Sequence, residues 1–353
     1  MIGYYAHQHG SGHCRYGELL ANYFRDDLTV FTSYDYQFSE GVHYIKLEDE
    51  NPDGSTYQQN QVEPPHYLHY SPVGQKSIQK RSLQLLQGII DRNIKLLIVD
   101  VSAEIAALAR SSSIPYAYIK LPGNRGDKGH LAAFQGAVFI IAYYPENFED
   151  AGTPEWVRNK TIYLGFQSRN TSSPGFRKAE KIENLTVISG KGGNENLRKS
   201  LPAIVRRFRN ATITVLGEFE RQPEFPNVQY KGFIEDINAC LSHSDLIVAN
   251  CGMNTVSEIV RLKKPFLAIP EKRPFNEQNS MAFHLVQNGL ALDIEGINQM
   301  PDSEILNFPK SKIEDSSMDL ETFKILLMQN LKALPTIPQK FRAVKAKKSY
   351  QYV

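Results

Sequence analysis

Histidine and glycine residues gather in the turn that follows the first apolar stretch of the chain. Ile2–Ala6 predicts a short buried strand that runs into the turn HQHGSGHCR, and an amphipathic helix is expected over Tyr16–Phe24. A neutral imidazole in such a turn could take a proton from an attacking hydroxyl group. His13 is therefore the first candidate for a general base, with His9 and His7 as second choices.

Other interpretations of this turn remain open. His13 could be a capping or packing residue, and Arg15 could meet an acceptor or phosphate charge or lie exposed on the surface. The turn contains G-x-G, but Arg15 stands where the dinucleotide-binding fingerprint has its third glycine. The second expected strand, Thr29–Ser33, also ends in hydroxyl groups instead of the acidic residue that binds ribose in that fold. An NAD(P)-dependent oxidoreductase is therefore not favoured.

The stretch from Ser244 to Ile294 predicts a strand, a helix, a second strand and a second helix. DLIVAN and FLAIP are short apolar runs typical of buried strands. Such a βαβα unit belongs to a parallel sheet, in which ligands lie beyond the carboxyl ends of the strands. The polar clusters Asn250–Glu258 and Glu271–Gln278 both fall at those ends.

These polar clusters have the chemistry to bind a nucleotide sugar. A small-residue turn at a helix N-terminus presents free N–H groups to a phosphate. Glu258 lies on the same helix face as Asn254 and could accept hydrogen bonds from a ribose diol. Glu277 and Gln278 combine an acceptor with an amide, which suits sugar hydroxyl groups. The alternatives are a solvated helix residue for Glu258 and an ordinary helix cap for Asn276.

A second glycine-rich turn precedes another predicted helix. Leu185–Ile188 predicts a strand, SGKGGN forms the turn over Ser189–Asn194, and the helix is expected over Leu197–Phe208. This order could cradle a phosphate, although it lacks the spacing of a Walker A loop. A plain tight turn is the alternative.

The patterns NCGMNTVSE, PFLAIP and NEQNSMA resemble the donor-binding half of GT-B nucleotide-sugar glycosyltransferases. The most similar groups are the bacterial peptidoglycan N-acetylglucosaminyltransferases and the UDP-glucuronosyltransferase-like enzymes. The run GSGHCRYG also resembles a G-x-G-H-x-x-R loop in a hydrolytic relative that releases UDP from an amino sugar. The resemblance covers most of the second half of the chain but only the first loop of the first half. Asn250-Cys251 departs from it, because many relatives carry His-Gly or Ser-Gly there.

The resemblance implies two Rossmann-like, doubly wound α/β domains that face each other across a cleft. Residues 1–165 would form the acceptor-side domain, residues 166–180 a linker, and residues 181–317 the donor-binding domain. Residues 318–353 would form a helix and a basic tail, which could cross back to the first domain, attract anionic lipid or end in solvent, and the solvated end is favoured.

The resemblance also implies a role for individual residues. Contacts to the donor phosphates are expected from Gly12, Ser189, Gly190, Gly192, Gly252, Asn254 and Thr255. Contacts to the nucleobase and ribose are expected from Phe233, Ile234 and Glu258, and contacts to the donor sugar from Glu277 and Gln278.

The expected activity is transfer of a sugar from a nucleoside diphosphate sugar, UDP-linked in first place, to an acceptor hydroxyl group. A glycan, a lipid-linked molecule or a small molecule would be the acceptor. His13 would act as the base, with no metal and no cofactor. A nucleotide-sugar hydrolase, a 2-epimerase and a non-catalytic nucleotide-sugar-binding subunit are the alternatives.

Two polar features have less specific interpretations. The region Glu48–Gly74 is rich in proline, tyrosine and histidine, and could be an acceptor-binding lid or a surface insertion. His66 and His69 have the spacing H-x-x-H, but no third metal ligand is apparent in the sequence. Asp100, at the end of an apolar run, could lie at a strand end of the cleft or cap the helix expected over Ser102–Arg110, and the cap is favoured.

Composition limits the class of protein. The 353 residues suit two domains, and 41% hydrophobic and 22% charged residues are ordinary for a globular chain. The net charge of +2 argues against a nucleic-acid binder. Three cysteines without a C-x-x-C pair do not predict a disulfide framework. No signal peptide and no apolar run near 20 residues is visible, so a cytoplasmic protein, at most peripheral on the inner membrane face, is expected.

Overall fold

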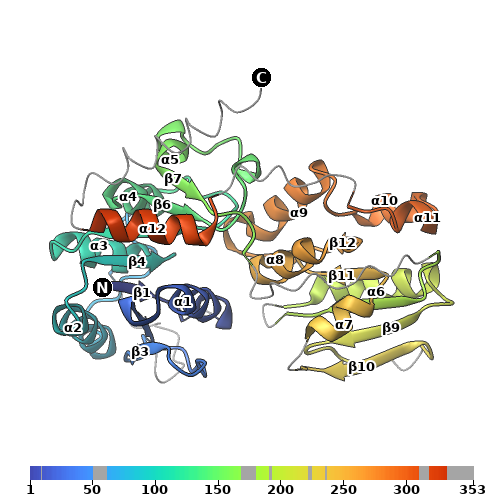
Figure 1. Ribbon diagram of the computed structural model, residues 1–353, viewed down its shortest axis with the longest axis horizontal. Coiled ribbons are helices and arrows are strands. Elements are labelled where there is room, and N and C mark those ends of the chain that lie inside the picture. The colour runs from blue at the N-terminus through green and yellow to red at the C-terminus, as the bar shows by residue number, and fades with distance from the viewer. Residues whose placement is uncertain are drawn as a thin grey trace. The chain divides into compact units, whose positions relative to one another are not determined.

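The computed structural model describes residues 1–8, 10–50, 62–167, 180–190, 193–221, 225–234, 237–309 and 318–331. The chain divides into two compact units, coloured along the sequence in Figure 1. Unit 1 contains Met1–Leu121, Arg125–Gly165 and the C-terminal helix α12 (Leu320–Asn330). Unit 2 contains Pro122–Asn124 and Phe166–Asp315.

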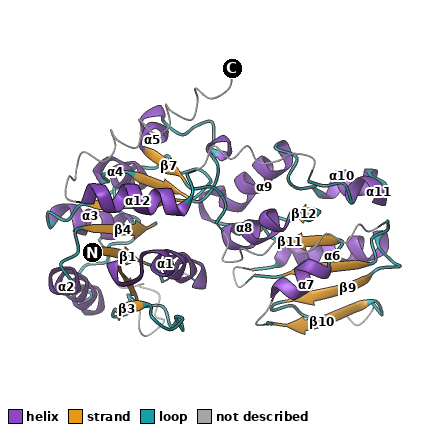
Figure 2. Cartoon of the chain, viewed as in Figure 1, coloured by secondary structure: helices purple, strands orange, loops and turns teal. Residues whose placement is uncertain are grey.

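Unit 1 is built on a parallel sheet of seven described strands in the order β3-β2-β1-β4-β5-β6-β7. Figure 2 shows strands in orange and helices in purple. The strands are β1 (Ile2–Tyr5), β2 (Leu28–Thr32), β3 (His43–Lys46), β4 (Leu96–Asp100), β5 (Tyr116–Lys120), β6 (Ile140–Ala142) and β7 (Thr161–Tyr163). The helices are α1 (Ser11–Phe24), α2 (Lys76–Asp91), α3 (Ala103–Ser111), α4 (Lys128–Gly136), α5 (Glu155–Lys160) and α12. The strand order reverses between β1 and β4, and such a switch point is where doubly wound sheets bind ligands.

Unit 2 repeats this design with five described strands in the order β10-β9-β8-β11-β12. The strands are β8 (Asn184–Ile188), β9 (Thr212–Leu216), β10 (Val228–Gly232), β11 (Leu246–Ala249) and β12 (Phe266–Ala268). The helices are α6 (Glu195–Arg207), α7 (Ile237–His243), α8 (Met253–Leu262), α9 (Glu277–Gln287), α10 (Ile294–Gln299) and α11 (Asp302–Ile305). Its switch point lies between β8 and β11.

Continuous apolar runs explain why the central strands form. All residues of β4 (LLIVD) and of β11 (LIVA) are buried, as expected of parallel strands that helices cover on both faces. Each unit has its own core: Val99, Tyr118 and Phe134 belong to that of unit 1, and Val187 and Val248 to that of unit 2. The predicted α/β class with two doubly wound domains is therefore confirmed.

Helix α12 packs against the rest of unit 1, although the residues of unit 2 separate them in the sequence. The ring of Phe323 makes edge contacts with Phe24 and Phe139, each with ring centroids 6.4 Å apart. Lys324 Nζ donates a hydrogen bond to the backbone oxygen of Tyr23 at 2.6 Å. The basic residues expected in the tail after this helix lie outside the described part of the chain.

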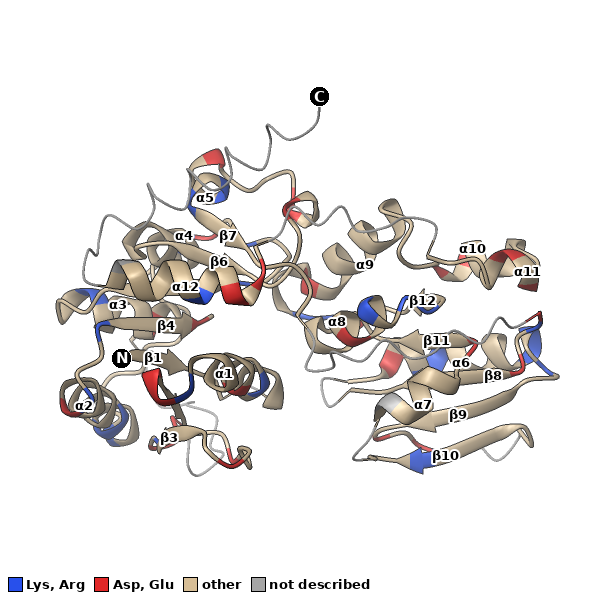
Figure 3. Ribbon diagram, viewed as in Figure 1, with Lys and Arg blue, Asp and Glu red and all other residues tan. Residues whose placement is uncertain are grey.

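The distribution of charged residues and the length of the helices are consistent with the net charge and the lack of long apolar runs in the sequence. Acidic and basic residues occur on both units (Figure 3), in keeping with the net charge of +2. Among the described residues, every helix is too short or too polar to span a bilayer. Cys14, Cys240 and Cys251 are all free thiols.

Helix α1 begins earlier than the sequence predicted. It starts at Ser11 instead of Tyr16, so His13 lies in the first turn of the helix and not in the preceding loop. Gly10 takes the N-cap position with φ of 94°, a left-handed conformation that glycine adopts without strain. The chain can therefore turn from β1 directly into α1 and present His13 at the end of the sheet.

Candidate functional site

His13 forms a close pair with an acidic residue of unit 1. Its Nδ1 atom lies 2.8 Å from Oδ2 of Asp100, at the end of β4, which is the neighbour of β1 in the sheet. Asp100 is almost fully buried, whereas the His13 side chain is 17% exposed. A carboxylate oxygen accepts hydrogen bonds, so Nδ1 carries the hydrogen and the lone pair of the neutral ring is on Nε2.

A tyrosine of β1 holds the same carboxylate. The hydroxyl group of Tyr4 donates to Asp100 Oδ2 at 2.8 Å. Burial and the negative charge of Asp100 raise the pKa of Tyr4 well above its usual value, so this hydroxyl group remains a donor. Asp100 Oδ1 is buried and has no hydrogen-bond partner among the described residues. The same oxygen of Asp100 thus accepts hydrogen bonds from Tyr4 and from His13.

The interpretation of Asp100 as a helix cap was wrong. The cap of α3 is Ser102, whose Oγ accepts a hydrogen bond from the backbone nitrogen of Ile105 at 3.2 Å. Local pattern did not reveal the pairing of Asp100 with His13, because the two residues are 87 positions apart in the sequence. The available signal was its position at the end of an apolar strand beside the switch point.

The other candidates in the first turn have different surroundings. The ring of His7 lies 5.7 Å from that of His13, and His7 is half-buried. Arg15 is exposed. Gly12 is in the first turn of α1, whose N-terminus receives no side-chain cap. His9 lies outside the described residues.

In unit 2, the predicted donor residues lie after the carboxyl ends of the strands. Gly252 is the N-cap of α8, and Asn254 and Thr255 fall in the first turn of this helix. No side chain caps α8, so its first N–H groups can meet an anion. Glu258 is one turn further along and is half-buried.

The turn after β8 differs from the expected phosphate cradle. The Ser189 hydroxyl group donates to the backbone oxygen of Glu218 at 2.9 Å and accepts from Asn194 Nδ2 at 3.1 Å. A Cβ atom on Gly190 would lie 3.3 Å from Asn250 Nδ2, so this turn packs closely against the end of β11. Any phosphate contact here would therefore come from backbone N–H groups. Gly192 lies outside the described residues.

The N-terminus of α6 is closed by a carboxylate from the neighbouring strand end. Glu271 accepts hydrogen bonds from the backbone nitrogens of Asn196 and Leu197, each at 2.9 Å. Glu271 is 4% exposed. A negative side chain therefore already caps α6. Of the two helices α6 and α8, it is α8 whose N-terminus has no side-chain cap.

Gln278 joins the two strand ends that border α8. Its Oε1 accepts hydrogen bonds from the backbone nitrogen of Cys251 at 3.1 Å and from that of Glu271 at 2.9 Å. Gln278 is 3% exposed, and its Nε2 lies 3.8 Å from the place a Cβ on Gly252 would take. Glu277, beside it, is half-buried at the start of α9. The amide oxygen of Gln278 is therefore engaged by the protein, and only its amide nitrogen faces the turn at Gly252.

The predicted nucleobase residues follow the edge strand β10. Phe233 is 59% exposed, unusual for a large apolar side chain, and Ile234 is half-buried. Two surface hollows of unit 2, of about 310 and 350 Å³, are lined by other residues. The first lies against α7 and includes Cys240 and His243, and the second lies beside α10. Neither hollow includes the predicted donor residues. The assignment of the donor site therefore depends on the position of these residues at the carboxyl ends of the strands.

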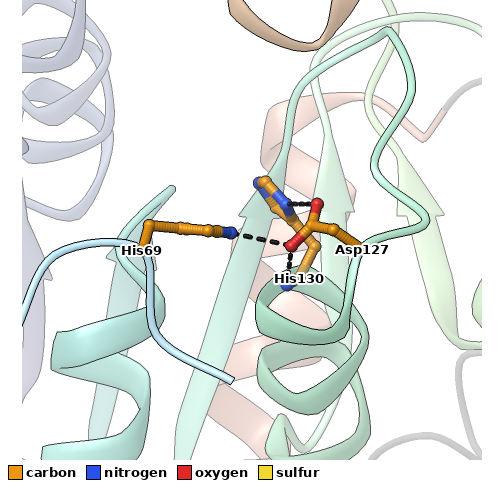
Figure 4. A group of neighbouring side chains, drawn as sticks. All are labelled: His69, Asp127 and His130. Carbon is orange, nitrogen blue, oxygen red and sulfur yellow. Dashed lines mark hydrogen bonds and ion pairs between the residues drawn. The ribbon is translucent and has the colours of Figure 1, made fainter. Parts of the chain in front are cut away.

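A further cluster of titratable groups lies in unit 1 (Figure 4). His69 Nε2 is 2.7 Å from Asp127 Oδ1, and His130 Nδ1 is 2.5 Å from Asp127 Oδ2. These residues could hold a metal ion, because their ligand atoms all lie within 4.8 Å of one another. His66 is not a member, so the H-x-x-H spacing was not the informative signal. The other two members, Asp127 and His130, come from the start of α4.

Comparisons with known proteins agree with the fold. Residues 173–304 match the glycosyltransferase family 28 C-terminal domain. The chain is 28% identical over 127 residues to the UDP-N-acetylglucosamine–N-acetylmuramyl-(pentapeptide) pyrophosphoryl-undecaprenol N-acetylglucosamine transferase of Lachnoclostridium phytofermentans, covering 34% of each chain. It is also 28% identical over 161 residues to the transferase of the same name from Prochlorococcus marinus, covering 40% of this chain and 43% of the relative. The aligned part thus spans less than half the length of these relatives.

Solved structures match over nearly the whole chain. MurG of Acinetobacter baumannii has a TM-score of 0.55 at 14% identity, covering 98% of this chain and 94% of that one. The calicheamicin glycosyltransferase CalG4 has a TM-score of 0.54 at 15% identity, covering 100% and 99%. The spinosyn rhamnosyltransferase SpnG, complexed with thymidine diphosphate, has a TM-score of 0.55 at 12% identity, covering 96% and 95%. The chain therefore has the GT-B fold and resembles nucleotide-sugar glycosyltransferases of the MurG group.

Proposed function

We propose that this protein transfers a sugar from a nucleoside diphosphate sugar, a UDP-sugar in first place, to an acceptor hydroxyl group. The observation that carries this proposal is the match of residues 173–304 to a glycosyltransferase domain. The uncapped N-terminus of α8 falls inside these residues, at the carboxyl edge of the sheet where doubly wound folds bind nucleotides. The choice of UDP follows the names of the relatives from Lachnoclostridium phytofermentans and Prochlorococcus marinus.

The donor would bind at the carboxyl edge of unit 2. The N–H groups of the first turn of α8, around Asn254 and Thr255, would hold the diphosphate, and Glu258 would accept hydrogen bonds from the ribose. Phe233 and Ile234 would border the nucleobase. Glu277 and the amide nitrogen of Gln278 would contact the sugar. Contacts to the diphosphate from Gly12, Ser189, Gly190, Gly192 and Gly252 would come from backbone groups.

The diphosphate is the leaving group, and its charge grows as the bond to the sugar breaks. A helix N-terminus already aimed at this charge stabilises it without reorganisation in the transition state. Because Glu271 closes α6, the N-terminus of α8 would supply this stabilisation in place of that of α6. This arrangement would work without a metal ion, so we expect turnover to persist in EDTA.

His13 would act as the general base for the acceptor. Its Nε2 lone pair takes the hydroxyl proton while the acceptor oxygen bonds to the anomeric carbon and the carbon–oxygen bond to the diphosphate breaks. Asp100, 2.8 Å from Nδ1, holds the productive tautomer and stabilises the imidazolium that forms. The same pair could activate water, so hydrolysis of the donor is the alternative reaction of the same site.

The test is turnover by the full chain. UDP release would be measured from UDP-N-acetylglucosamine and UDP-glucose, each with a lipid-linked glycan, a small-molecule alcohol or no acceptor. We expect release that depends on one acceptor class, with the sugar recovered on that acceptor. Release at the same rate without acceptor would indicate a hydrolase, and recovery of an isomeric UDP-sugar a 2-epimerase. Binding without release under every condition would indicate a non-catalytic subunit.

A further inference from the structure

His69, Asp127 and His130 bring together three metal-ligating side chains from two separate parts of unit 1 (Figure 4). His69 lies in the loop before α2, Asp127 is the N-cap of α4, and His130 is in the first turn of α4. The His69 and His130 rings have centroids 4.6 Å apart. Both imidazoles thus approach a single carboxylate, one at each of its oxygens.

Hydrogen bonds and burial set the protonation of two of these groups, Asp127 and His130. Burial alone would raise the pKa of Asp127, but hydrogen bonds from His69 and His130 bring it below its usual range. Burial and the nearby charge of Arg125 lower the pKa of His130 to about 4. At neutral pH the site therefore offers a carboxylate and a neutral imidazole, the forms that coordinate metals.

The solvent exposure of the three side chains would also allow a metal ion to reach them. The side chain of His130 is 2% exposed, whereas those of His69 and Asp127 are 33% and 36% exposed. One side of the cluster is thus buried and the other open to solvent. An ion could enter from that side and keep a water molecule as a further ligand.

We propose that His69, Asp127 and His130 bind a transition-metal ion of the Zn²⁺ type. Two imidazole nitrogens and one carboxylate are a ligand set that suits zinc and its neighbours better than magnesium or calcium, which prefer oxygen ligands. This site is separate from the transfer reaction proposed above and does not depend on it.

Arg125 tunes the affinity of this site through the tautomer of His130. Its NH1 lies 3.2 Å from His130 Nε2. A guanidinium group only donates, so Nε2 accepts and Nδ1 carries the hydrogen that points to Asp127. When a metal ion takes Nδ1, this hydrogen moves to Nε2 and faces Arg125, which must give up its hydrogen bond. Arg125 therefore weakens metal binding, and its replacement by an acceptor strengthens it.

A bound metal ion would link the surface segment that contains His69 to helix α4. The backbone nitrogens of His69 and Tyr70 both donate to Glu104 Oε1, at 2.7 and 2.9 Å, so the segment is already held at the start of α3. A Cβ on Gly129 would lie 2.6 Å from His69 Nε2, so the His69 ring also lies directly on α4. Coordination through His69 replaces a hydrogen bond with a stronger link between this segment and α4.

The experiment is calorimetric titration of ZnCl₂ into the EDTA-stripped full chain at pH 7, for the wild type and four variants. His69→Gln removes a ligand, and Asp127→Asn removes the charge but can still cap α4. We expect each to weaken binding by at least about 10-fold. Arg125→Gln offers an acceptor to Nε2–H and should tighten binding by about 10-fold.

His43→Gln is the matched control. His43 Nε2 lies 3.2 Å from Asp26 Oδ1 in an exposed pair of unit 1 that is not part of the His69 cluster. This variant should bind Zn²⁺ like the wild type. Thermal unfolding without metal would confirm that each variant is folded. Three outcomes would overturn the proposal: no Zn²⁺ binding by the wild type, wild-type affinity in both His69→Gln and Asp127→Asn, or weaker binding by folded Arg125→Gln.

Discussion

Glu271 Oε1 lies 2.9 Å from the backbone nitrogen of Leu197, so a carboxylate from the end of β12 closes the N-terminus of helix α6. The other oxygen of the same carboxylate accepts from the backbone nitrogen of Asn196. This contact joins two neighbouring elements of unit 2 and removes α6 from the helices that could hold a phosphate. It also makes Glu271 a structural residue in a region that the sequence associated with ligand binding.

Replacing Glu271 with alanine should therefore destabilise the protein. Two backbone donors at a helix N-terminus lose their acceptor, and the charge that complements the helix dipole is lost, at a cost of about 1–2 kcal/mol. Urea unfolding would measure this change. Glu195→Ala is the matched control in the first turn of the same helix, because Glu195 is exposed and pairs with Lys199 in solvent. An equal loss in both variants would contradict the capping role of Glu271.

Gln278 should act chiefly as a brace between β11 and β12. Gln278→Ala leaves the buried N–H groups of Cys251 and Glu271 without their acceptor, which should cost about 2–4 kcal/mol in the free energy of unfolding. Gln278→Glu keeps an oxygen acceptor in place and should retain most of the stability. Unfolding of the two variants in urea distinguishes them. Equal stability of Gln278→Ala and the wild type would show that the amide oxygen does not brace the strands.

The neutral state of His130 predicts an acid-sensitive fold in metal-free protein. The pKa of His130 is about 4 in the folded state against 6.5 for an unperturbed histidine, so the unfolded chain binds the proton more readily between these values. Stability is therefore fully present above pH 6.5 and is lost as the pH falls toward 4. From pH 7 to pH 5 the loss should be about 2 kcal/mol.

Urea unfolding in EDTA at pH 7 and pH 5 would measure this loss. His130→Gln should remove most of it, whereas His43→Gln, which changes an exposed histidine, should retain it. A wild-type protein with the same free energy of unfolding at both pH values would contradict a neutral, buried His130.

The structure also shows which features could be read from the sequence. Apolar runs such as IKLLIVDV (β4) and DLIVAN (β11) predicted the strands correctly, because a buried parallel strand needs consecutive apolar residues. Glycine-rich turns likewise predicted where helices begin, although α1 starts at Ser11 and not at Tyr16. The α/β class followed from this alternation of strand and helix, whereas the order of the strands in each sheet came from the structure.

Side-chain partners were not readable in the same way. Asp100 meets His13 across 87 residues, and His69 meets Asp127 across 58. Such contacts depend on how strands are ordered in the sheet, which local pattern does not specify. Gln278 carried a further ambiguity, because a polar residue at a strand end can bind either a ligand or a neighbouring backbone.

Asp100→Asn should impair turnover without affecting donor binding. Asparagine preserves the shape of the side chain but not the charge that stabilises a protonated His13, so kcat should fall by about 10²–10⁴-fold. The affinity for the UDP-sugar should stay within about 3-fold of the wild type, because Asp100 bonds to Tyr4 and His13 and the proposed donor residues other than Gly12 lie in unit 2. Tyr4→Phe removes one hydrogen bond to the same carboxylate and should reduce kcat less. Full activity of Asp100→Asn would exclude the His13–Asp100 pair as the base.

The donor site is the central claim, and thermal unfolding with a panel of nucleotide ligands tests it most directly. UDP-, GDP-, TDP- and CMP-sugars and NAD(P) would be added to the wild type, to Glu258→Ala and to Glu304→Ala, which changes an exposed glutamate of unit 2. A ligand at about 100 times its Kd should raise the Tm by several degrees through mass action. We predict this rise for UDP-sugars in the wild type and Glu304→Ala, and its loss in Glu258→Ala. A rise with NAD(P) alone, or none with any nucleotide sugar, would contradict the proposed function.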